Sequence, residues 1–125
     1  MFMTTLQVAL GGAIGAALRY LVGVGVFRLT GPGFPYAVMS VNIVGSFLMG
    51  LFVVFAAKTS NSHLSPFVMT GILGGFTTFS AFSLEAYTLF ERGQTAQAAI
   101  YVGASVALSI AGLIAGVMTA RGIYA

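Results

Sequence analysis

The sequence comprises 125 residues, of which 58% are hydrophobic and only 6% charged, with a formal net charge of +3. This length and polarity leave no room for a water-soluble domain and are typical of a membrane protein. The absence of cysteine excludes disulfides, thiolate metal sites and a cysteine nucleophile. Because only two carboxylates are present, no paired acid–base site is available. We therefore expect neither an enzyme nor a nucleic-acid-binding protein.

Four apolar stretches each approach the roughly 20 residues needed to span a bilayer. We expect helices over residues 5–27, 36–57, 66–90 and 95–120, within a single all-α transmembrane domain covering residues 1–125. The first connection, Gly31 to Pro35, is rich in turn residues. Ser65 followed by Pro66 is typical of an N-cap and the first helical position, and Gly93 is typical of a helix C-terminus.

The few cations are balanced across the membrane. These spans place Lys58 and Arg121 on one side and Arg28 and Arg92 on the other. Because an excess of Lys and Arg normally sets orientation, the balance predicts insertion both ways up and an antiparallel, dual-topology homodimer. The alternative is a weak bias set by the amino-terminal amine. Glycines four residues apart, which let another backbone approach closely, occur in the first and last spans: Gly11 and Gly15, Gly112 and Gly116.

The third stretch is interrupted by the run GGFTTFSAF, residues 74–82. An unpaired polar group in hydrocarbon costs several kcal/mol, so a break is tolerated only where it is buried in protein or lines a wet cavity. We therefore expect the functional site to lie in this segment. Phe79 and Phe82 share a helix face, where they either pack or present their positive edges to a small anion in a narrow passage. Carbonyls freed by the break would suit a cation such as Na⁺.

Three polar side chains within the spans are candidate functional residues, because it is costly to hold polar groups in lipid. Arg19 either contributes to function or assembly, or extends its head group to the interface. Glu85 either pairs with Arg19 or lies near a water-filled mouth. Asn42 either donates to an anion or forms an interhelical hydrogen bond.

Three hydroxyls lie on one stripe of the last span. Tyr101, Ser105 and Ser109 are spaced four residues apart. Such a stripe can replace part of an ion's hydration shell, whereas isolated serines usually bond to carbonyls of their own helix. The spacing leaves both readings open.

A family resemblance follows from these residues. The run GGFTTFSAF, continued by Ser83-Leu84-Glu85, resembles the Fluc (CrcB) fluoride channels, together with Arg19, the Val41-Asn42 pair and the segment Tyr101 to Ser105. The resemblance extends over nearly the whole chain, in order and at matching length.

The resemblance implies an antiparallel dimer in the cytoplasmic (inner) membrane, with two pores that export fluoride passively. It implies a central structural sodium ion on the backbone carbonyls of Gly74 and Thr77, and places Arg19 and Glu85 at the pore or its support. Ala81 stands where the family often has a second hydroxyl. The residues that the resemblance implies for the pore are Asn42, Phe79, Ser80, Phe82, Tyr101, Ser105 and Ser109.

Two other classes of protein share some of these features. A small proton-coupled multidrug antiporter of dual topology would need a carboxylate in the first span, which has none. A purely structural assembly subunit would explain the glycines, yet gives no reason for a hydroxyl-rich break.

Overall fold

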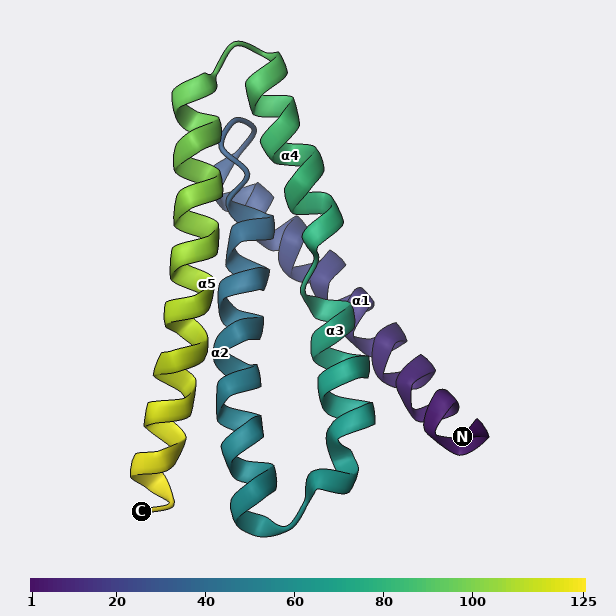
Figure 1. Ribbon diagram of the computed structural model, residues 1–125. Helices are drawn as coiled ribbons and strands as arrows, with labels where there is room; N and C mark the ends of the chain where they lie inside the picture. The colour runs from purple at the N-terminus through teal and green to yellow at the C-terminus, as the bar shows by residue number, and fades with distance from the viewer.

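The computed structural model describes residues 1–125 and is entirely helical (Figure 1). Four apolar helical segments are long enough to cross a membrane, which confirms the predicted all-α membrane fold at that level. The observed helices begin within three residues of the expected positions and end within three of them. The elements are α1 (Phe2–Thr30), α2 (Tyr36–Thr59), η1 (Ser62–Leu64), η2 (Pro66–Leu73), α3 (Gly74–Phe76), α4 (Phe79–Glu91) and α5 (Thr95–Ile123).

The third apolar stretch is not one regular helix. It begins with η2, a π-helix whose wider turns use bonds to the fifth residue back, and continues through the single turn α3. Thr77 (φ −86°, ψ 157°) and Thr78 (φ −151°, ψ 123°) then have extended backbone before α4 begins at Phe79. Gly74 and Gly75, at the start of the polar run, remain helical. The interruption therefore lies at the two threonines.

Backbone conformation explains where the helices stop. Gly31 (φ 71°) and Gly33 (φ 121°) turn the first connection, and Gly93 (φ 79°) follows α4, all in the region that glycine adopts without a steric cost. Pro66 is at the start of its helix, as expected. The prediction of a side-chain cap at Ser65 is wrong. That residue directly follows η1 and has helical dihedrals, and its side chain makes no capping hydrogen bond.

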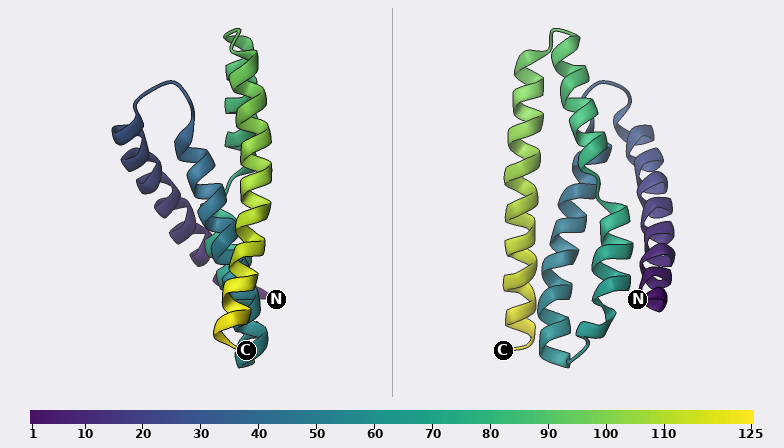
Figure 2. Two further views of the ribbon diagram at one scale, coloured as in Figure 1. Left: turned by 90° about the vertical axis from the view of Figure 1, so that its left-hand side faces the viewer. Right: turned by 45° about the vertical axis from the view of Figure 1, so that its right-hand side comes forward.

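Close packing joins α2 to α5 and α1 to η2 (Figure 2). Glycine makes both contacts possible: a methyl group on Gly15 would overlap Ile72 O, and one on Gly116 would overlap Phe47 O. The predicted close approach at these glycines therefore occurs within one chain. The α1–α2 and α4–α5 connections lie at one end of the molecule, with both termini and the α2–η1 connection at the other (Figures 1 and 2).

Little of the single chain is buried. Only 17 of 125 residues are shielded from solvent, so most apolar side chains are free to face lipid or another copy. One buried cluster contains Phe82, Leu89, Ala98 and Tyr101, where α4 meets α5, and Phe34 from the first connection packs against it. This small core lies beside the helix interruption and positions the candidate site.

Candidate functional site

The amide of Asn42 holds the interruption in place. Its Nδ2 donates to Thr78 O over 3.0 Å, and Thr78 N donates to its Oδ1 over 2.8 Å. In a continuous helix Thr78 N would donate to Gly74 O instead. The side chain from α2 therefore pairs with the extended backbone as a neighbouring strand would. Of the two readings left open for Asn42, the interhelical hydrogen bond is present.

Thr77 and Thr78 complete the interruption with local bonds. Thr78 Oγ1 accepts from Ala81 N over 3.2 Å and so caps the first turn of α4. Thr77 Oγ1 donates to Leu73 O over 2.9 Å, which satisfies the carboxyl end of the preceding turn. The carbonyl of Gly74 has lost its helical donor to Asn42. Main-chain oxygen is thus left available at the point where the helix stops.

A groove of about 370 Å³ runs beside the interruption. It is bounded by α2, the two threonines, the start of α4 and the middle of α5. Its lining contains both polar and apolar side chains, and five of the seven predicted pore residues are among them. The lining residues are Asn42, Gly45, Ser46, Met49, Thr77, Thr78, Phe79, Phe82, Ser105, Val106, Ser109, Ile110 and Leu113.

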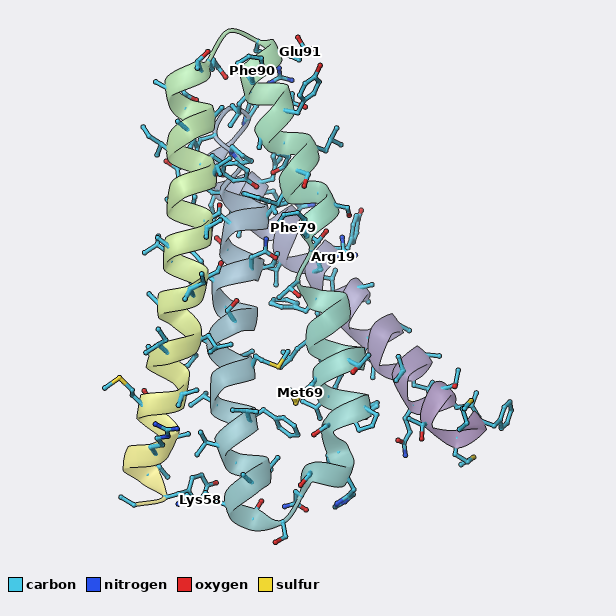
Figure 3. The ribbon with its side chains drawn as sticks, in the orientation of Figure 1. Arg19, Lys58, Met69, Phe79, Phe90 and Glu91 are labelled. Carbon is cyan, nitrogen blue, oxygen red and sulfur yellow. The ribbon has the colours of Figure 1, made fainter.

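The two predicted aromatic residues are differently placed. Their ring centroids lie 5.4 Å apart, yet Phe82 is 7% exposed and belongs to the core, whereas Phe79 is 76% exposed. Figure 3 shows Phe79 at the level of the interruption. A phenyl ring so exposed in one chain contributes little to that chain's own packing. Phe82 packs in the core and lines the groove at the same time.

The hydroxyl stripe of α5 is divided between two surroundings. Ser105 is 4% exposed and its Oγ has no hydrogen-bond partner, while Ser109 lies further along the same groove. Tyr101 is fully buried and does not line the groove; its hydroxyl donates to Glu85 Oε2 over 3.2 Å. Ser80 is exposed, with its Oγ 3.3 Å from Thr78 Oγ1. The structure thus groups Ser105 and Ser109 and separates Tyr101 and Ser80 from them.

Arg19 and Glu85 share a cavity of about 590 Å³ between α1, α2 and α4, but no ion pair joins them. Arg19 Nε donates to Gly75 O over 3.0 Å, so its charge lies beside the last turn before the interruption (Figure 3). Thr78 lines both this cavity and the groove. Arg19 therefore supports the interruption from one side as Asn42 does from the other.

Several residues at the site were missed by sequence reasoning. Ser46 follows Asn42 by one helical turn and faces the same groove, a spacing that the sequence displays. Thr78 occupies an N-cap, for which threonine is a preferred residue. The position of Phe34 against α5 has no sequence signal, because it depends on how a loop folds back.

These features define a multi-pass helical membrane protein. Its third span is interrupted beside a groove that is lined by hydroxyl-bearing and aromatic side chains. The family described as CrcB-like protein, Camphor Resistance (CrcB), matches residues 6–117, and the chain belongs to this family. Relatives named fluoride-specific ion channel FluC include one from Ruegeria sp. (strain TM1040), 68% identical over 98% of both chains. Others are from Roseobacter denitrificans, 66% identical over 94% of both chains, and Cereibacter sphaeroides, 62% identical over 98% of both.

Proposed function

We propose that this protein is a passive, fluoride-selective channel that exports fluoride across the cytoplasmic membrane. The names of its relatives support the ion, and one observation in the chain itself carries the proposal. Ser105 Oγ is buried in the groove wall without a partner, close to the Asn42 amide and the phenyl rings in the same lining. A buried hydroxyl left unpaired is costly, and an anion passing through the groove would accept a hydrogen bond from it.

Selectivity would come from the size of the ion. Fluoride is small and holds water tightly, so a pore must replace its hydration shell with short hydrogen bonds and with positive aromatic edges. The donors near the groove include the hydroxyls of Ser46, Ser105 and Ser109 and the second N–H of Asn42. Chloride is too large to make full use of donors in a narrow passage. Passive flow needs no carboxylate that takes up and releases protons, and α1 contains no carboxylate.

The functional unit would be an antiparallel homodimer with two pores. The exposed ring of Phe79 is a surface that a second copy would cover, turning an open groove into a closed passage. A structural sodium ion would lie between the copies, held by the carbonyls of Gly74 and Thr77. Gly74 O fits this assignment because Thr78 N donates to Asn42 instead, and carbonyl oxygens suit such a cation. Replacing sodium by N-methylglucamine should lower the dimer's melting temperature; an unchanged value would remove the ion from the proposal.

Liposome efflux tests the proposed function. Purified protein in vesicles should release fluoride down its gradient without a proton gradient, and should release chloride poorly. Phe79→Ile is a suitable variant, because this side chain is largely exposed and its loss should leave the fold of the chain intact while flux falls. Vesicles that retain fluoride would remove the channel assignment. Release that requires an imposed proton gradient would favour a proton-coupled antiporter.

A further inference from the structure

A continuous row of aromatic rings links the first connection to the helix interruption. The ring centroids are 4.8 Å apart from Tyr36 to Phe34, 5.5 Å from Phe34 to Tyr101, 5.3 Å from Tyr101 to Phe82 and 5.4 Å from Phe82 to Phe79. Each separation lies within the range for interacting rings. A residue outside the four spans, Phe34, is therefore linked through the Tyr101 ring to the groove.

The first connection holds Phe34 in a defined position. Gly33, immediately before it, has φ 121°, which a residue with a side chain rarely adopts, and Pro35 follows it. Tyr36 N donates to Phe34 O over 2.9 Å, which tightens the turn. The ring then packs against the core cluster between α4 and α5. This connection thus carries a side chain inward, where loops usually carry theirs outward.

Tyr101 depends on Phe34 for its orientation. Its side chain is fully buried, with the ring of Phe34 edge-on at 85° and that of Phe82 tilted at 39°. A tyrosine hydroxyl can donate one hydrogen bond, and here Glu85 Oε2 accepts it. The phenolic oxygen is fixed to the ring, so the position of the ring determines the position of the hydroxyl. The two neighbouring rings therefore set the position of the hydroxyl relative to Glu85.

Phe34 also borders a partly open cavity that the Tyr101 side chain does not line. A cavity of about 250 Å³ lies beneath the first connection, and its lining includes Phe34, Glu85, Thr88 and Leu89 but not Tyr101. Of these lining residues, Phe34 packs edge-on against the Tyr101 ring, and Glu85 accepts a hydrogen bond from the Tyr101 hydroxyl. A smaller side chain at position 34 would enlarge a space that already exists and would expose the Tyr101 ring to it.

We propose that Phe34 is a positioning residue for fluoride passage. Its ring holds Tyr101 in place and closes the hydroxyl stripe of α5 against the cavity beneath the first connection. This inference rests on the proposed function, since it concerns the same stripe. Without the aromatic edge of Phe34, the side chains of Tyr101 and of its hydrogen-bond acceptor Glu85 become more mobile. Water then reaches the Tyr101 end of the stripe from the cavity. Passage then becomes slower and less selective.

Efflux from vesicles tests this with three variants. Phe34→Leu should lower fluoride release about three- to tenfold, the effect expected for one lost aromatic pair, and should lower the ratio of fluoride to chloride release. Phe34→Tyr keeps the ring and should stay within about twofold of the unmodified protein. The matched control is Phe55→Leu, which removes a ring that packs against Phe52 and Tyr124 and does not line the groove. Should Phe34→Leu aggregate, Phe34→Met replaces it.

Two further measurements show whether Phe34 acts through Tyr101. In a Tyr101→Phe background, Phe34→Leu should change release by less than about twofold, because coupled residues do not act additively; effects that multiply would overturn the inference. With 3-fluorotyrosine incorporated, the fluorine resonance of Tyr101 should shift in Phe34→Leu and stay unchanged in Phe55→Leu. If the unmodified protein releases no fluoride, the proposed function fails. If it does, while Phe34→Leu matches it in rate, selectivity and resonance, only this inference fails.

Discussion

Ser105 is the residue on which the proposed ion passage depends most directly. Its hydroxyl is buried and unpartnered, a state that costs about 1–3 kcal/mol in a folded protein. A stretch of helix selected for stability alone would have alanine at this position. The penalty is understandable if the hydroxyl is needed by something that is present only transiently. Stability and function should therefore respond in opposite directions when this side chain is changed.

Ser105→Ala should lower fluoride release at least about tenfold, since a hydrogen bond to a charged group contributes about 1.5–3 kcal/mol. The melting temperature should stay the same or rise, because an unsatisfied group has been removed. Efflux and thermal unfolding in detergent measure the two effects. Ser83→Ala is the control: that hydroxyl bonds to Phe79 O of its own helix and should affect neither. A variant that releases fluoride normally would show that the buried hydroxyl is not part of the path.

Asn42→Ala should destabilise the protein by about 2–3 kcal/mol, because the N–H and carbonyl of Thr78 both lose their hydrogen-bond partner. Thermal unfolding measures the loss. Ser46→Ala, one turn further along α2 and facing the same groove, should change stability by less than about 0.5 kcal/mol. Equal stability of the two variants would mean that the Asn42 amide does not hold the interruption.

Polar residue types within the spans can be recognised from the sequence, but their partners cannot. Arg19, Asn42 and Glu85 are conspicuous because polar groups in spans are expensive. The structure gives each a partner that spacing cannot reveal: Gly75 O, the Thr78 backbone and the Tyr101 hydroxyl. Each of these pairs joins segments at least 16 residues apart. Sequence periodicity reports the face of one helix and cannot report which other helix lies against it.

At the scale of elements, glycine determines how closely the helices approach. Hydrophobicity alone locates the four spans and their ends to within a few residues. It does not predict the π-helical turns of η2, because these depend on how the segment fits against α1. The contact is so close that a Cβ on Gly11 would lie 2.9 Å from Gly71 Cα. Backbone packing of this kind leaves no flexible side chain to move aside.

Gly15→Ala should destabilise the protein by about 1–3 kcal/mol, since the added methyl group overlaps a main-chain oxygen, Ile72 O, that cannot rotate away. Gly25→Ala lies on the same helix, where nothing lies within 4 Å of the added atom, and should be neutral or stabilising because alanine is the better helix former. Chemical or thermal unfolding of the pair separates the two cases. A neutral Gly15→Ala would show that α1 is free to move away from η2.

At the scale of the whole molecule, the single chain leaves most of its residues exposed. Only 17 of 125 residues are buried, among them few of those that line the groove. The cations are divided evenly, with Arg28 and Arg92 at one end and Lys58 and Arg121 at the other, and the two ends are those that the structure places apart (Figure 1). The proposed antiparallel homodimer requires such a balance, because neither end of the chain then carries the excess of cations that fixes one orientation.

Biasing the charge tests the antiparallel arrangement. Ser62→Lys with His63→Lys adds two cations at one end, and Gln94→Lys with Gln97→Lys adds two at the other; all four side chains are exposed. Each biased protein should insert one way only and release no fluoride, while the two expressed together should restore release. Glutamine at the first two positions is the neutral control. Activity from either biased protein on its own would contradict the antiparallel dimer.

The π-helical turns of η2 make the length of this segment critical. Each residue of an α-helix rotates the chain by about 100°, so deleting one residue between Pro66 and Leu73 would restore ordinary turns and rotate everything that follows. Thr78 would then face away from Asn42. Variants with single deletions here should fail to protect cells from fluoride, whereas deletions near Ser62 should be tolerated. A selection of length variants for growth in fluoride would reveal this contrast, and survivors shortened within η2 would refute it.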